Sequence, residues 1–192
     1  MTSQALPSPI AVGARRRTVL VALVAAVAGA AIALVALLGA TGGSPHASRA
    51  TTIDGSDFSI AFPSGWSAVK ADQLAKLPGR PAAMVRRNDR HATVIVRRKA
   101  APKDQTLRAL TKSLTTQLDR RFPDFRFVSS RVVRLRAGNA FVYTFLRSRA
   151  KVAQSIAIVR VGKTSFTLDS VVAESDTGAA REVAAIVRSF GR

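Results

Sequence analysis

Residues 140–149 of this 192-residue chain read AFVYTFLRSR, a run in which two sets of apolar side chains alternate. Successive residues of a strand point to opposite faces of the sheet. Each face of this run therefore carries its own apolar set, Phe141, Tyr143 and Phe145 on one and Val142 and Leu146 on the other. Apolar residues on both faces are typical of a central strand that is covered from both sides. The run predicts a sheet with a packed layer on each face.

Stretches with strand character lie on both sides of this run, at 125–136 before it and at 152–161 and 165–173 after it. The turn residues Ala137-Gly138-Asn139 separate the first stretch from the run. Short connections join antiparallel strands, whereas parallel strands need long crossovers. We therefore expect these four strands to form an antiparallel meander.

Earlier in the chain, residues 82–87 and 91–99 flank Asn88-Asp89-Arg90 and predict a hairpin. Val94 and Val96 share one face of its second strand, and Ile95 and Arg97 share the other. Residues 58–62 also alternate and predict a further strand, which Pro63-Ser64-Gly65 ends before Trp66.

Helical periodicity is clearest from about Asp104 to Arg121, where leucines recur three to four residues apart and Asp104 or Thr106 can cap the first turn. A short helix is expected at 72–77 before Pro78-Gly79, and a closing helix at 178–190. Strands followed by a helix, a meander and a last helix indicate an α+β fold, an antiparallel sheet flanked by helices.

A different pattern dominates the N-terminal part, because every residue from Val19 to Leu38 is Ala, Val, Leu or Ile except Gly29. Twenty helical residues rise about 30 Å, which matches the hydrocarbon core of a bilayer. We therefore expect one N-terminal transmembrane helix over residues 18–40. This segment also accounts for a positive mean hydropathy of +0.15 in a chain with a formal net charge of +19.

The charges beside this segment predict its orientation. Arg15, Arg16 and Arg17 directly precede it, whereas Arg49 is the only Lys or Arg in the twenty residues after Ala40. The positive-inside rule then places the N-terminus in the cytoplasm. The alternative is a cleaved secretory signal, whose apolar region usually covers only about 7–15 residues. We expect a single-pass protein of the cell membrane with four parts: a cytoplasmic tail (1–17), an uncleaved signal anchor (18–40), a flexible linker (41–50) and an extracytoplasmic domain (51–192).

Motifs that would indicate catalysis or metal binding are missing from the sequence. There is no cysteine, and His91 is the only histidine of the domain, where we expect a structural role. Gly162-Lys163-Thr164 lacks the earlier glycine of a phosphate-binding loop, since that position is Ala157, and is expected to be a turn. The eleven acidic residues do not show the spacing of a calcium loop. We predict no catalytic residue, no cofactor and no metal ligand.

Positive charge is the one strong chemical signal of the domain. The chain has 30 Lys and Arg against 11 Asp and Glu, and only four of the cations precede residue 51. Arg134 and Arg136 share a strand face, as do Arg147 and Arg149, and we expect these four to contact an acidic protein or an anionic envelope polymer. Nucleic acid is disfavoured as a partner outside the cytoplasm. The remaining alternative is a basic surface without a dedicated ligand.

Three stretches of the domain together resemble the PsbP-like superfamily. They are the opening strand with its Pro-x-Gly-Trp end (Phe58 to Trp66), the late strand Thr164 to Leu168, and the terminal helix Ala184 to Phe190 with its Ile-x-x-Ser-Phe end. The resemblance covers about residues 51–192. It implies an α-β-α sandwich around an antiparallel sheet.

The resemblance also implies a function, because this superfamily is mostly non-catalytic. Its photosynthetic members are extrinsic subunits of photosystem II that dock through basic residues onto acidic membrane-protein surfaces and help to retain calcium and chloride. This chain carries its own membrane anchor and resembles a bacterial member. We expect a non-enzymatic binding or assembly module. The alternatives are an envelope enzyme with an unrecognised site, which a deep pocket with convergent acids would favour, and a surface protein held passively by anionic lipid or cell-wall polymer.

Overall fold

The computed structural model describes residues 50–89, 91–100 and 106–192. The predicted cytoplasmic tail with Arg15, Arg16 and Arg17, the predicted transmembrane helix 18–40 and nearly all of the predicted linker lie outside the described residues. Asp104, one of the two expected helix caps, also lies outside them. Within the described ranges, no helix is long and apolar enough to cross a bilayer.

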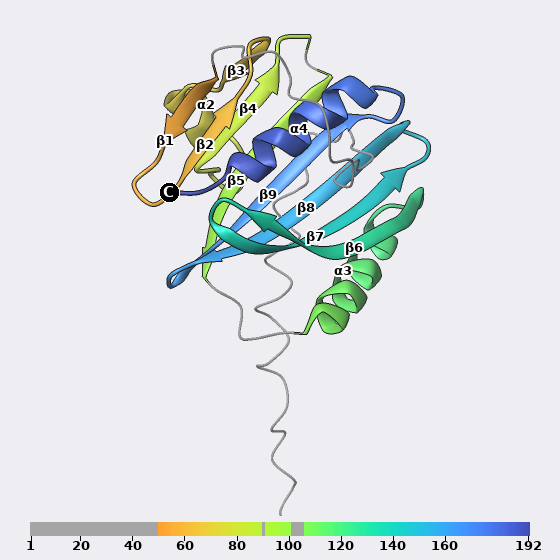
Figure 1. Cartoon of the computed structure of the whole chain (residues 1–192). Helices are drawn as coiled ribbons and strands as arrows, with labels where there is room; N and C mark the ends of the chain where they lie inside the picture. The colour runs from red at the N-terminus through yellow and green to blue at the C-terminus, as the bar shows by residue number, and fades with distance from the viewer. Residues whose placement is uncertain (1–49, 90, 101–105) are drawn as a thin grey trace, which may run out of the picture.

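A seven-stranded antiparallel sheet forms the centre of the domain, with the strand order β3-β4-β5-β9-β8-β7-β6 (Figure 1). The predicted meander is confirmed, because β6, β7, β8 and β9 pair in sequence order, and β9 then pairs with β5. The strands span Trp66–Ala68 (β3), Ala83–Arg87 (β4), Ala92–Ala100 (β5), Phe125–Leu135 (β6), Gly138–Arg147 (β7), Val152–Val161 (β8) and Thr164–Ala173 (β9).

The predicted strand at 58–62 belongs to a second, two-stranded sheet. There β2 (Ser59–Phe62) pairs with β1 (Thr51–Asp54), which lies outside the large sheet. Neither β1 nor the three-residue β3 was expected, because such short segments show too little periodicity to be recognised. Between β8 and β9 the chain turns at Gly162, whose φ of +58° is a left-handed conformation that favours glycine. The expected turn at Gly162 is confirmed.

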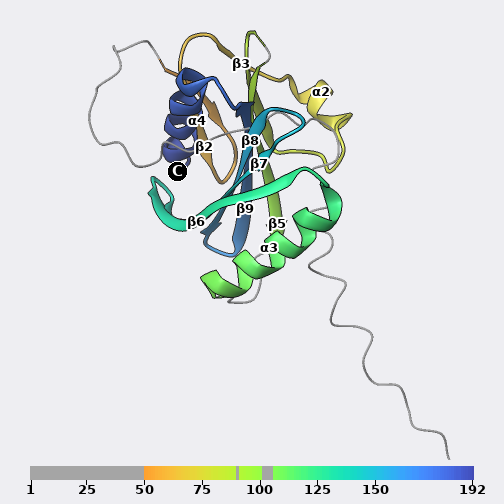
Figure 2. The same ribbon diagram turned by 90° about the vertical axis from the view of Figure 1, so that its right-hand side faces the viewer.

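Helices cover both faces of the sheet, as the run at 140–149 predicts (Figures 1 and 2). α3 (Leu107–Arg121) packs on one face, where Leu114 and Leu118 contact the aromatic row of β7. α4 (Thr177–Ser189) packs on the other face together with β2. A short helix, α2 (Ala71–Ala75), follows β3. α3 begins after Thr106, whose side chain accepts a hydrogen bond from the backbone N–H of Ala109.

The antiparallel register gives the sheet two distinct ends. At one end lie the β6–β7 turn and the β8–β9 turn. The C-terminus of α4 lies at the same end, because the backbone N–H of Arg136 in the β6–β7 turn donates to the carbonyl of Arg188. At the opposite end lie the β4–β5 turn, the β7–β8 turn and the N-terminus of α4.

Candidate functional site

The structure separates the four arginines that the sequence singles out. Arg134 and Arg136 lie beside the β6–β7 turn, whereas Arg147 ends β7 and Arg149 lies in the following turn. β7 spans ten residues, so these two pairs are about 30 Å apart along the strand. The four side chains therefore do not form one cluster.

Arg147 already has an internal partner. Its Nε donates to Oδ1 of Asp124 at 2.7 Å, and its guanidinium lies 4.0 Å from the ring centroid of Phe122. The side chains of Arg147 and Asp124 are 16% and 4% exposed. The backbone N–H of Arg149 donates to the same carboxylate at 3.2 Å. Burial works to raise the pKa of Asp124, but the hydrogen bond and charge of Arg147 outweigh it and hold that pKa below its usual range.

Arg134 and Arg136 are exposed and form no salt bridge with any described residue. Further exposed cations gather at the same end of the sheet, because the β8–β9 turn and the end of α4 are next to the β6–β7 turn. We call this surface the basic end, and it comprises Arg134, Arg136, Arg160, Lys163, Arg188 and Arg192.

Register places two of these cations on one face of the sheet. Arg134 on β6 lies opposite Asn139 on β7. On the other side of β7, Ala140 pairs with Val159 on β8, and the same register continued by one residue puts Asn139 opposite Arg160. Cross-strand partners share a face, and two strand spacings amount to about 10 Å. Arg134 and Arg160, which are distant in sequence, therefore lie close enough to bind one acidic segment together.

The opposite end of the sheet is different, because two of its arginines, Arg87 and Arg147, are paired with carboxylates, although Arg149 there is exposed. Arg87 lies between three carboxylates, those of Asp89, Asp176 and Glu182, with Nη1 2.7 Å from Oδ2 of Asp176. Across the described residues, six carboxylates are held by only four arginines, Arg87, Arg97, Arg98 and Arg147. Internal pairing thus removes more negative than positive charge, and the excess positive charge of the domain remains on its surface.

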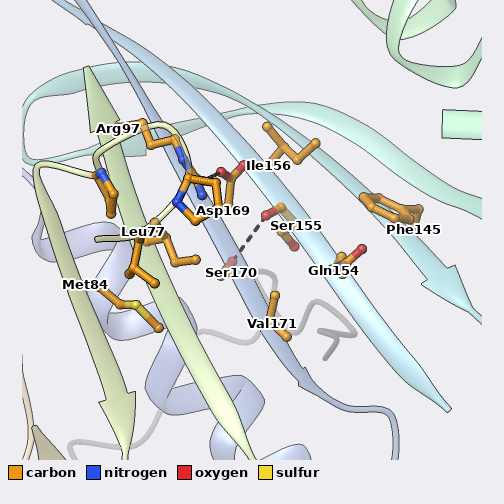
Figure 3. A pocket seen from close by; sticks show the side chains of 13 residues that line it. Leu77, Met84, Arg97, Phe145, Gln154, Ser155, Ile156, Asp169, Ser170 and Val171 are labelled. Carbon is orange, nitrogen blue, oxygen red and sulfur yellow. Dashed lines mark hydrogen bonds and ion pairs between the residues drawn. The ribbon is translucent and has the colours of Figure 1, made fainter. Parts of the chain in front are cut away.

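The sheet face that carries α3 also contains a pocket of about 70 Å³ (Figure 3). Its floor holds a buried ion pair between Arg97 on β5 and Asp169 on β9. Burial raises the pKa of Asp169, and the charges of Arg97 and Lys99 oppose that rise. Burial lowers the pKa of Lys99, which continues the same strand face as Arg97. Asp169 is the only carboxylate among the described residues that line the pocket.

Comparisons with solved structures show which fold this is. Cyanobacterial PsbP (CyanoP) from Synechocystis sp. PCC 6803 superposes with a TM-score of 0.54 at 18% identity, over 80% of this chain and 97% of that one. The domain has the PsbP-like fold. No family model and no curated protein sequence matches the chain.

Two other proteins share the PsbP-like fold with this chain. The Ran-binding protein Mog1p of Saccharomyces cerevisiae has a TM-score of 0.52 at 11% identity, over 74% of this chain and 95% of its own. LpqN, a protein involved in cell envelope biogenesis of Mycobacterium tuberculosis, has a TM-score of 0.50 at 11% identity, over 76% and 86%. At these identities the comparison concerns the fold, and the expectation of a PsbP-like domain is confirmed.

Sequence reasoning missed the polar floor of the pocket in this PsbP-like domain. In the sequence, Arg97 stands in the basic run Arg97-Arg98-Lys99, and Asp169 is one acid among eleven. Only their position on buried strand faces distinguishes them. A signal was available, because charged residues within apolar strands such as Thr164–Ala173 are rare unless they are paired.

Proposed function

We propose that this PsbP-like domain is a non-enzymatic binding module that the segment 18–40 anchors to the outer face of the cell membrane, and that an acidic protein docks on the basic end. The fold supports a binding role, since neighbours with this fold include a Ran-binding protein and a protein of cell envelope biogenesis. The charge pattern around residues 18–40 supports the extracytoplasmic location.

The observation that carries the proposal is the exposed charge of three arginines at the basic end. Arg134, Arg136 and Arg188 are exposed and make no salt bridge within the described part of the chain. A field of one sign raises the local concentration of oppositely charged partners and accelerates their association. An acidic surface is therefore the partner that this end attracts.

Arg147 and Arg149 have a different role in the proposal. The charge of Arg147 is largely neutralised by Asp124, so an acidic partner gains little by approaching it. Both residues lie at the opposite end of β7. The proposal therefore retains Arg134 and Arg136 as partner contacts and assigns Arg147 to the stability of the β7–β8 turn.

The chain enters the domain at a point away from the basic end. The chain enters β1 at Thr51, which lies opposite Phe62 at one end of β2. The basic end is at the other end of β2, where Ser59 pairs with Gly191. The predicted linker thus joins the side of β2 that is away from the basic end.

Site-specific crosslinking in cells tests the proposal. A photo-crosslinking residue at exposed position 139, inside the basic end, should give a discrete protein adduct, whereas the same residue at exposed position 116 on α3 should not. The double reversal Arg134→Glu/Arg136→Glu should abolish that adduct. The matched reversal Arg108→Glu/Arg120→Glu on α3 should leave it intact. An adduct that survives the first double variant would refute the assigned surface.

A binding measurement separates the partner classes. Binding of the full chain to poly-L-glutamate should weaken about tenfold in Arg134→Glu/Arg136→Glu, because each exposed contact contributes up to about 1 kcal/mol. Binding to phosphatidylglycerol vesicles should change as little as in the α3 control. If Arg134→Glu/Arg136→Glu weakened binding to the vesicles more than binding to poly-L-glutamate, passive attachment to anionic lipid would be supported. Release of the protein by alkaline carbonate washing would contradict the anchor.

A further inference from the structure

The pocket on the α3 face is built mainly from apolar side chains (Figure 3). The sheet supplies its floor, and the segment after α2 supplies one wall. The main apolar lining residues are Leu77, Pro81, Met84, Ile95, Phe145 and Val171. Its volume of about 70 Å³ is well above the roughly 10–15 Å³ that admits one water molecule. The pocket therefore has room for a small organic group.

Two buried acceptor atoms are left without a hydrogen bond in this apolar surrounding. Gln154 is 3% exposed and Asp169 is 5% exposed. Within the described residues, neither Oε1 of Gln154 nor Oδ1 of Asp169 has a hydrogen-bond partner. A buried polar atom without a partner costs about 1–3 kcal/mol. Both side chains line the pocket, so a ligand there can supply the missing donor.

The register places Gln154 and Asp169 on the same face of neighbouring strands. Ile156 on β8 lies opposite Asp169 on β9, and Gln154 precedes Ile156 by two residues on the same strand face. Gln154 and Asp169 are thus diagonal neighbours, which lie about 7–8 Å apart at their backbones and can converge through their side chains. One small ligand can contact both.

The charges around the pocket select an uncharged ligand. A carboxylate would lose its hydration among apolar side chains and face the unpartnered oxygens of Asp169 and Gln154, while the lining cation Arg97 is already paired with Asp169. An ammonium group would lie near Arg97 and Lys99 and would lose its hydration among apolar side chains. A hydroxyl donates a hydrogen bond to these acceptors without either penalty.

We propose that this pocket binds a small uncharged molecule with an apolar body, whose hydroxyl donates to Asp169 Oδ1 or Gln154 Oε1. The proposal does not depend on the basic end, which lies on other residues. The competing explanation is that ordered water alone fills the pocket, since buried waters commonly satisfy such atoms.

The methionines of the chain allow a direct test with the full-length protein in nanodiscs. The sequence has two, Met1 and Met84, and only Met84 is among the residues that line the pocket. In protein labelled with carbon-13 at the methionine methyl groups, 1-pentanol should shift the Met84 signal in a saturable manner. The Met1 signal serves as the internal control for effects of the alcohol on the membrane.

Two matched probes and two matched variants complete the test. Pentylamine and pentanoate, which have the same apolar body, should require at least about tenfold higher free concentration to shift Met84. Gln154→Leu should weaken pentanol binding several-fold while the protein stays folded, because replacing an unpartnered acceptor by an apolar group is nearly neutral. Gln117→Leu on α3 should have no effect.

The possible results discriminate between the explanations. Saturable binding of pentanol that is weakened by Gln154→Leu supports the proposal. If none of the three probes moves the Met84 signal, the pocket holds water only and the proposal is wrong. Equal shifts with pentanoate or pentylamine would overturn the selectivity for a hydroxyl. Pentanol binding that is unchanged in Gln154→Leu would overturn the role of Gln154 as an acceptor.

Discussion

Arg136 lies so close to Gly191 that a Cβ atom added at position 191 would stand 2.7 Å from Cγ of Arg136. Two backbone hydrogen bonds hold the neighbouring chain in place, from Ala137 N–H to the Phe190 carbonyl at 2.8 Å and from Arg136 N–H to the Arg188 carbonyl at 3.1 Å. The last residues of the chain thus pack against Arg136, one of the arginines of the basic end. Position 191 links stability to the orientation of that charge.

Substitution of Gly191 should therefore destabilise the domain through Arg136. We expect Gly191→Ala to cost about 1–3 kcal/mol, because the added methyl group meets the rigid base of the arginine side chain. The cost should fall in part in an Arg136→Ala background, which removes Cγ and Cδ of Arg136 but keeps its Cβ, at 2.9 Å from the added atom. Urea unfolding followed by the fluorescence of Trp66, the only tryptophan, measures both values. Gly178→Ala is the control, since its Cβ would meet only an ordinary contact at 3.4 Å. Equal costs in both backgrounds would exclude the coupling.

Acid should destabilise the domain partly through Asp124. Its folded-state pKa is lowered below 3.8, so the unfolded chain takes up a proton at higher pH than the folded chain does. The stabilisation that ionised Asp124 gives is therefore fully present above its unfolded-state pKa. It is lost as the pH falls through its lower folded-state pKa. Asp124→Asn should lower the free energy of unfolding by about 1.5–3 kcal/mol at pH 7. The loss should be smaller near pH 3.

The control for this pH experiment is Asp54→Asn, which changes an exposed carboxylate without a salt bridge in the described chain. Its loss should change the free energy of unfolding at pH 7 by less than about 0.5 kcal/mol. The same stability difference for Asp124→Asn at both pH values would contradict the role of Arg147.

Asp176 should stabilise the domain in two separable ways. Its Oδ1 accepts from Ala179 N–H at 2.8 Å as the cap of α4, and its Oδ2 lies 2.7 Å from Arg87. We expect Asp176→Ala to cost about 1–2 kcal/mol, since it removes the cap and the ion pair. Asp176→Asn keeps a capping oxygen and should cost less. Chemical denaturation measures both variants, and identical losses would show that the cap contributes little.

Tyr143, the only tyrosine, should ionise at unusually high pH. Burial raises the pKa of its hydroxyl above 10.0, and the hydrogen bond of 2.7 Å with Thr115 partly opposes that rise. Thr115→Val should therefore raise the pKa further. Absorbance at alkaline pH follows the phenolate, and the same titration in urea gives the ordinary value for comparison. Ionisation of the folded protein at that ordinary pH would show that the ring is accessible.

Local sequence patterns predict much of this fold. The alternation of residues 140–149 predicts coverage of both sheet faces, and β8 matches its expected bounds. The expected strand at 140–149 instead starts and ends two residues earlier, and α3 begins at Leu107. These differences are small because strand and helix ends depend on hydrogen bonds that periodicity does not record.

The partners of β2 could not be predicted in this way. Ser59 pairs with Gly191, and the backbone N–H of Ala61 donates to Ser189 Oγ at 2.9 Å. These contacts join residues more than a hundred positions apart. Residues 58–62 alternate like any half-buried strand, and nothing in that alternation specifies which surface it will join.

The order of amino acids alone establishes the charge excess, the apolar run at 18–40 that predicts an anchor, and the succession of strands and helices. Tertiary structure decides which charges remain available. It pairs Arg147 with Asp124 and Arg97 with Asp169, while Arg134 and Arg136 stay exposed beside the C-terminus. The physical reason is that charges interact according to their separation in space and their burial. Both are set by the register of strands that are distant in the chain.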